Sequence, residues 1–214
     1  MIVAIAGASG EVGKHLLEFL LQDETVTDVV SLIRSKSLIE NQKLNNQQIN
    51  FNAIDELPII EIVAVFCCLG TTIKKAGNQD RFKKVDFEYV VNLAKWAKKI
   101  GAKQFHVISS MGADSASKVF YSRIKGEMQD AVKQIGIEST FIYQPSLLDS
   151  EREELRTGER FGIILFRLLR ILFVGPLKKY ASIKVSDVAK GMWQRSKNPA
   201  KGFYIIPSNT ILAT

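Results

Sequence analysis

A glycine-rich segment near the first residue constrains the fold of this chain more than any other feature. The segment GASGEVG at residues 7–13 follows an apolar run at 2–6, which predicts a buried strand, and opens a helix predicted over 11–22. In such a strand–turn–helix unit Gly7 makes the tight turn, Gly10 lets a pyrophosphate approach the backbone, and Gly13 lets the helix pack on the strand. The helix start presents N–H groups and a positive dipole end to phosphates. The segment therefore predicts a dinucleotide-binding site.

The rest of the chain alternates short apolar runs with longer amphipathic ones. Strands are predicted at 26–33, 62–68, 105–109, 139–143 and 203–206, with a weak one around 48–52 after a polar loop over 35–48. Helices are predicted at 80–100, 117–135 and 186–196. Repeated β-α-β units with near-continuous apolar strands indicate a parallel sheet covered on both faces. We therefore predict an α/β fold: one doubly wound, Rossmann-type domain over residues 1–214, with a small substrate or partner region from about residue 146.

The residues after the second and third predicted strands bear on which dinucleotide binds. An acidic residue after the second strand would bind the ribose 2′-hydroxyl of NAD, whereas Arg34 suits the 2′-phosphate of NADP. Ser35 and Lys36 add donors and charge beside it. Asp55 follows the weak third strand, where its carboxylate either accepts from the adenine amino group or is an ordinary loop aspartate. The sequence favours NADP(H) over NAD(H).

A serine, a tyrosine and a lysine form a second group of candidate site residues. Ser109 and Ser110 end the fifth predicted strand, and Tyr121 and Lys125 follow at i, i+4 spacing on one helix face. Carbonyl reduction needs a proton donor, and a tyrosine with its ordinary pKa near ~10 is a weak one at neutral pH. The Lys125 cation would favour the phenolate and hold the nicotinamide ribose, while Ser110 would bind the substrate oxygen. The alternative is structural, with serines that cap a turn and a tyrosine that packs.

Charge and composition argue against several other functions. The net charge of +7 invites a nucleic-acid interpretation, but the lysine pairs are scattered and no aromatic residues interleave with them, so we predict no nucleic-acid binding. Cys67 and Cys68 are adjacent, so no framework disulfide is expected, and Cys68 has no nearby histidine partner. His15 and His106 are separate, and no metal site is predicted. Without a secretory signal pattern at the start, a cytoplasmic protein is expected.

The longest apolar stretch, Phe161–Val174, is the candidate contact for a partner. It is shorter than the ~20 residues that a membrane span needs, and Arg167 and Arg170 interrupt it. A helix there would carry one charged edge on an otherwise apolar surface. It would serve either as a core or dimer contact or as an interfacial membrane helix.

Six motifs between residues 1 and 160 carry a family resemblance. They are GASGEVG at 7–13, FCCLGTT at 66–72, KAG at 75–77, VD at 85–86, SSMGAD at 109–114, and Tyr121 with Lys125. Together they resemble the short-chain dehydrogenase/reductase superfamily in its atypical or extended branch, and more closely the Tat-interacting-protein oxidoreductase family. The chain differs at Gln144-Pro145-Ser146, where relatives carry Arg-Pro-Gly, and over its last 50 residues.

The resemblance implies a set of cofactor contacts and one catalytic group. Implied contacts are Ser9, Gly10, Glu11 and Val12 at the phosphates, Arg34 at the 2′-phosphate, Leu69 and Gly70 along the cofactor, Leu148 at the nicotinamide end, and Arg156 folded over the cofactor. Tyr121 is the implied proton donor or acceptor. The resulting hypothesis is an NADP(H)-dependent oxidoreductase with a small carbonyl or alcohol substrate. The alternative is a non-catalytic NADPH-binding sensor that modulates a partner, which would not need the Ser–Tyr–Lys set.

Overall fold

One parallel sheet organises the computed structural model, which describes residues 1–35, 39–54, 57, 61–149 and 182–213. Its seven strands run in the order β3-β2-β1-β4-β5-β6-β9. Their bounds are β1 Ile2–Ala6, β2 Asp28–Ile33, β3 Leu44–Gln48, β4 Ala64–Cys67, β5 Gln104–Ile108, β6 Ser139–Gln144 and β9 Gly202–Pro207; two short strands, β7 Leu148–Asp149 and β8 Ile183–Lys184, pair separately. The strand order reverses between β1 and β4, so the predicted doubly wound fold is confirmed. Ligands bind such sheets at this switch point, beyond the carboxyl ends of the strands.

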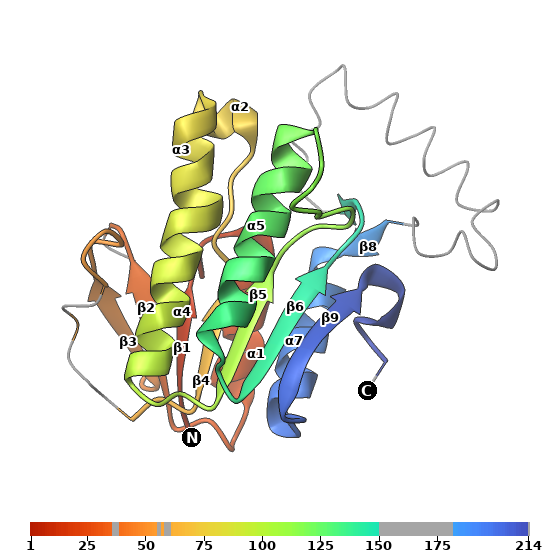
Figure 1. Ribbon diagram of the computed structural model, residues 1–214. Coiled ribbons are helices and arrows are strands. Elements are labelled where there is room, and N and C mark those ends of the chain that lie inside the picture. Colours follow the sequence, from red (N-terminus) through yellow and green to blue (C-terminus); the bar gives the residue numbers. More distant parts are fainter. Residues whose placement is uncertain (36–38, 55–56, 58–60, 150–181, 214) are drawn as a thin grey trace.

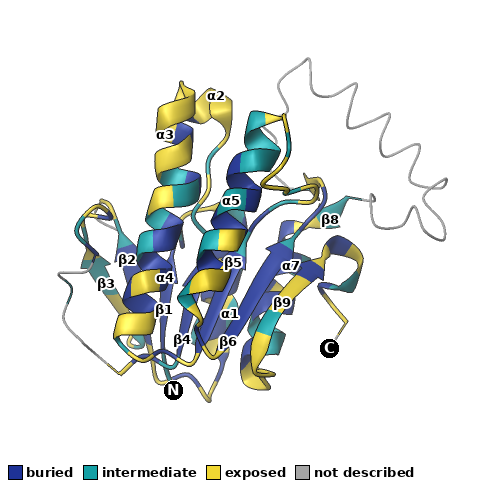
Figure 2. Cartoon of the chain, viewed as in Figure 1, coloured by how far each residue is buried: buried dark blue, intermediate teal, exposed yellow. Residues whose placement is uncertain are grey.

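Helices cover both faces of the sheet (Figure 1). On one face α1 (Glu11–Gln22) lies beside α7 (Val185–Lys197), and on the other α4 (Tyr89–Lys99) lies beside α5 (Phe120–Ile135). Each pair buries an apolar stripe against the strands, which Figure 2 shows as blue strands between helices with yellow outer surfaces. The two cores include Leu16, Leu20, Val188 and Met192 on the first face, and Leu93, Trp96, Met128 and Val132 on the second.

The helical column that ends in α4 contains an irregular turn. It starts with α2 (Ile73–Ala76) and α3 (Gln79–Lys83) and continues through a π-helical segment, η2 (Lys84–Glu88), into α4. The sequence predicts a regular helix over 80–100, and the π-helical turn is a correction. Phe82, Asp86 and Val90 are all buried, so the carboxylate of this turn lies on the core side of the column. π-Helical turns within α-helices are frequent at functional sites.

Two other predicted elements have boundaries that are wrong by three residues or more. The third strand is Leu44–Gln48, not 48–52, because β3 is an edge strand that pairs only with β2 and remains partly exposed. An edge strand needs no continuous apolar run, so its Asn and Gln residues resemble a loop in the sequence. Helix α5 starts at Phe120 rather than 117, since Ser117 forms a turn in which its Oγ accepts a hydrogen bond from the Val119 N–H.

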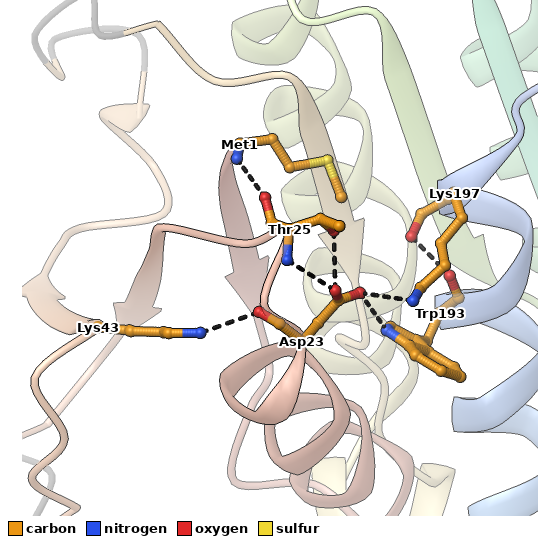
Figure 3. Close-up of polar contacts among 7 residues, drawn as sticks. Met1, Asp23, Thr25, Lys43, Trp193 and Lys197 are labelled. Carbon is orange, nitrogen blue, oxygen red and sulfur yellow. Dashed lines mark hydrogen bonds and ion pairs between the residues drawn. The ribbon is translucent and has the colours of Figure 1, made fainter.

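A buried carboxylate joins α1 to α7 at the amino end of the sheet (Figure 3). The side chain of Asp23, directly after α1, accepts hydrogen bonds from the Thr25 backbone and hydroxyl at 3.0 and 2.8 Å, and from Trp193 Nε1 at 2.8 Å. Lys197 Nζ lies 3.1 Å from it, and Lys43 Nζ donates to its backbone carbonyl at 2.9 Å. Burial favours the neutral acid, but these donors prevail and hold the pKa of Asp23 well below its usual range.

Over the described residues, we find no helix of the length and apolar character that crossing a membrane requires. The predicted partner contact Phe161–Val174 lies outside the described residues.

Candidate functional site

The glycine turn between β1 and α1 brings three backbone segments close together. Gly7 has a φ of 86°, and a Cβ there would lie 2.5 Å from the carbonyl oxygen of Cys68, the residue directly after β4. A side chain on Gly13 would strike the carbonyl oxygen of Gly7, so α1 packs directly against the turn. Gly10 is the N-cap of α1, and no side chain of the described residues caps this helix. The helix start is therefore an open anion-binding position.

A cavity of about 240 Å³ lies above this turn, at the carboxyl ends of β1, β2 and β4. Six of the predicted cofactor residues line it: Gly7, Ser9, Gly10, Arg34, Leu69 and Gly70. Sequence reasoning did not select several other lining residues, among them Ser31, Ile39, Asn46, Phe51, Val85 and Tyr89. The lining combines apolar side chains with polar groups and the exposed Arg34, as sites for small molecules do.

The other predicted cofactor residues either lie around this cavity or fall outside the residues that the structure describes. Glu11, Val12 and Gly13 form the first turn of α1, where Val12 and Gly13 are buried. Leu148 is an exposed residue of β7 and is absent from the described lining. Asp55 and Arg156 lie outside the described residues.

A buried ion pair connects the cavity to α5. Lys125 Nζ lies 2.7 Å from Asp86 Oδ1, and both side chains are at most 5% exposed. Asp86 Oδ2 accepts a hydrogen bond from the Thr71 N–H at 2.8 Å, next to the cavity-lining Gly70. Sequence reasoning assigned no role to Asp86. A carboxylate four residues from the buried Phe82 and Val90, on the apolar side of an amphipathic helix, was the signal that could have identified it.

Tyr121 precedes Lys125 by one turn of α5 and packs within an aromatic cluster. Its ring centroid lies 5.5 Å from that of Phe82, in a small core with Ala76 and Ile124. The loop after β5 is fixed to the same helix, because the Asp114 N–H donates to the Ser122 carbonyl at 3.0 Å. The end of β5 and the first turn of α5 thus form one packed unit.

The two serines after β5 have different environments. Ser109 is buried, and its Oγ accepts a hydrogen bond of 2.6 Å from Gln129 Nε2, whose Oε1 accepts one of 3.1 Å from Gln144. Ser110 Oγ is also buried but makes no hydrogen bond to any described residue. A buried hydroxyl without a partner is costly, and such groups often mark the position of a ligand atom. Ser109 is therefore held by Gln129, whereas the Ser110 hydroxyl has no partner among the described residues.

His106 is a neutral core residue. Gln104 Nε2 donates to the Ser196 carbonyl, so its Oε1 faces His106 Nε2 at 3.0 Å and requires a proton there. His106 Nδ1 must then accept from the Tyr143 hydroxyl, also at 3.0 Å. Burial and the charge of Arg195 lower the pKa of His106 to about 3. Both ring nitrogens of this histidine are thus engaged within the core, and the ring is neutral at neutral pH.

Neither cysteine is reactive in its environment. Cys67 and Cys68 are both free, and burial raises the pKa of Cys67 to about 12 and that of Cys68 well above its usual value. Neither thiol is therefore activated as a nucleophile. Among the described residues, no cluster of His, Cys, Asp and Glu side chains could hold a metal ion.

Comparison with known proteins shows similar sequences and similar folds. Residues 7–198 match the family model described as NAD(P)H-binding. Protein HTATIP2 of Rattus norvegicus is 39% identical over 162 residues, which are 73% of this chain and 66% of that protein. The chain thus spans about two thirds of the rat protein. Protein fmp52, mitochondrial, of Emericella nidulans is 32% identical over 169 residues, covering 73% of this chain and 71% of that protein.

Two solved structures have the same fold at low sequence identity. MoeE5 in complex with UDP-glucose and NAD superimposes with a TM-score of 0.71 at 13% identity, over 99% of this chain and 79% of that chain. The Bordetella bronchiseptica enzyme WbmH in complex with NAD+ gives 0.71 at 15% identity, over 97% and 75%. At such identities the likeness concerns the fold alone.

Proposed function

This chain belongs to the NAD(P)H-binding family, among the atypical short-chain dehydrogenases/reductases, and on that premise we propose that it is an NADP(H)-dependent oxidoreductase of a carbonyl or alcohol substrate. The glycine turn fits a dinucleotide, because Gly7 and Gly10 leave backbone exposed to the cavity and α1 begins beneath it. Ser9 and the first turn of α1 would hold the phosphates. Arg34 would pair with the 2′-phosphate, which favours NADP(H) over NAD(H).

The catalytic proposal places three side chains around the reacting carbonyl. When bound, the nicotinamide would supply or accept the hydride at the substrate carbon. Ser110 Oγ would hydrogen-bond the substrate oxygen, and the Tyr121 phenol would donate its proton to that oxygen. Lys125 would orient the ribose and stabilise the phenolate, while the ion pair with Asp86 keeps its ammonium in position.

One observation supports this proposal most strongly: the buried, unpartnered hydroxyl of Ser110 in the part of the chain that the structure describes. It lies at the carboxyl end of β5, in the loop that is bonded to the first turn of α5 near Tyr121. A substrate oxygen at this position would satisfy the hydroxyl.

A non-catalytic NADPH sensor is the second candidate, and one observation favours it. The ring of Tyr121 packs on Phe82, so this residue has a structural role that needs no turnover. In this alternative, cofactor binding would alter the contact with a partner, and the substitutions that matter would change binding rather than chemistry.

A pair of serine variants tests the catalytic proposal. Ser110→Ala removes a hydroxyl without a protein partner, so the melting temperature should be unchanged or higher, while turnover in a carbonyl screen with NADPH should fall by about 10-fold or more. Ser109→Ala is the matched control, because it breaks the bond with Gln129 and should lower the melting temperature. Normal turnover by Ser110→Ala would remove this residue from the mechanism.

A further inference from the structure

We infer that Asn46 and Gln48, two amide side chains of the edge strand β3, hold the segment that carries Arg34 and thereby set the preference for NADP(H); this inference rests on the proposed function of the same cavity. Arg34 is exposed at the cavity, directly after β2, and its side chain is long and flexible. A guanidinium on a loose segment would lose much of its binding free energy to ordering. The structure provides two bonds that order this segment in advance.

Gln48 fixes the first residue of the segment. Its Nε2 donates a hydrogen bond to the Arg34 carbonyl at 3.1 Å. The strand register makes this bond possible, because Gln48 is the partner of Ile33 and the Ile49 N–H donates to the Ile33 carbonyl at 2.8 Å. The backbone from which the guanidinium extends is therefore held by the end of β3.

Asn46 fixes the backbone at Ile39, on the far side of the segment that begins with Arg34. Its Nδ2 donates to the Ile39 carbonyl at 3.1 Å. Asn46, Arg34, Ser35 and Ile39 all line the cavity, so this bond lies within the wall of the site. Asn46 and Gln48 are two residues apart on a strand and thus share one face, on which Asn46 lines the cavity. Both are positioning residues that act through the backbone of the Arg34 segment.

The sequence of β3, Leu-Asn-Asn-Gln-Gln, contains its own controls. Asn45 and Gln47 have the same side chains as Asn46 and Gln48 but alternate onto the other face of the strand. The experiment measures dissociation constants for NADPH and NADH by titration of the full chain, with each of the four residues changed to Ala. Asn46→Ala and Gln48→Ala should each weaken NADPH binding by about 3- to 10-fold and change NADH binding by less than about 2-fold. Asn45→Ala and Gln47→Ala should leave both constants unchanged.

A double variant separates positioning from general loss of structure. Once Arg34→Ala has removed the guanidinium, adding Gln48→Ala should not change the NADPH-to-NADH ratio further. Gln48→Met keeps the length of the side chain without a donor and should behave like Gln48→Ala. The inference is overturned if the ratio in Asn46→Ala and Gln48→Ala equals that of the unmodified protein, or if the two control variants lower it equally. If the unmodified protein binds NADPH and NADH equally, the proposed NADP(H) preference itself is wrong.

Discussion

Asp86 contacts two parts of the site at once, with one carboxylate oxygen at the Lys125 ammonium and the other at the Thr71 backbone. Both charged groups are almost fully buried, and a buried ion without its counterion is far less stable than the pair. The carboxylate therefore couples the orientation of Lys125 to the turn that lines the cavity.

Asp86→Asn tests this coupling. The amide keeps the shape of the carboxylate but has only one oxygen for two donors, so its NH₂ must face either Lys125 Nζ or the Thr71 N–H. We expect a loss of about 3 kcal/mol in the free energy of unfolding, measured in urea, and lower turnover. Asp80→Asn, at an exposed position of α3, is the control and should change stability by less than about 0.5 kcal/mol. Equal stability of the two variants would show that the ion pair contributes nothing.

At the scale of the element, regular periodicity was predicted well and irregular backbone was not. β1 and α1 have the predicted bounds, because a continuous apolar run and a strong amphipathic stripe specify them locally. The polar strand β3 depends on its pairing with β2, and no local pattern marks the π-helical turn in η2, which contains the buried, paired Asp86. The residues of the site divide in the same way, into those that local motifs predict and those that contacts between elements reveal. Local motifs identify the glycines and Arg34, and helical spacing could have marked Asp86, whereas Asn46 and Gln48 are identified only by their contacts in the folded chain.

The Asp23 cluster between α1 and α7 predicts how the stability of the fold depends on pH. Because the pKa of folded Asp23 lies below its unfolded value near ~3.9, ionised Asp23 stabilises the fold above about pH 5, and this contribution is lost as the pH falls from there toward the folded pKa. Asp23→Asn should cost about 2 kcal/mol at pH 7 and reduce the loss of stability below pH 5. Urea unfolding at a series of pH values measures both effects.

Glu24→Gln is the matched control for Asp23→Asn, since Glu24 is the exposed neighbour. It should leave the pH dependence of stability unchanged. If Asp23→Asn follows the same curve as the unmodified protein below pH 5, the bonds from Thr25, Trp193 and Lys197 do not hold this carboxylate in its ionised form.

In the whole molecule, the two ends of the sheet carry different groups of residues. The Asp23 cluster joins α1 and α7 at the amino end (Figure 3), and the first turn of α5 lies at the carboxyl end (Figure 1). The cavity and Ser110 also lie at the carboxyl end. Two apolar cores hold the sheet rigid between these ends. Substitutions at the amino end should therefore change stability alone, whereas those at the carboxyl end should also change binding or turnover.

Turnover by Tyr121→Phe tests the central claim, that this chain is an oxidoreductase, most directly. The change removes one oxygen and keeps the ring that packs on Phe82. Tyr204→Phe is the control, because it removes a hydroxyl that bonds the Lys201 carbonyl at the surface of β9. On a carbonyl substrate found by screening with NADPH, Tyr121→Phe should lower turnover by ~10²–10⁴-fold, with NADPH affinity nearly unchanged, and Tyr204→Phe should have no effect. Normal turnover by Tyr121→Phe would contradict the catalytic assignment, and NADPH binding that alters a partner contact without any turnover would establish the sensor instead.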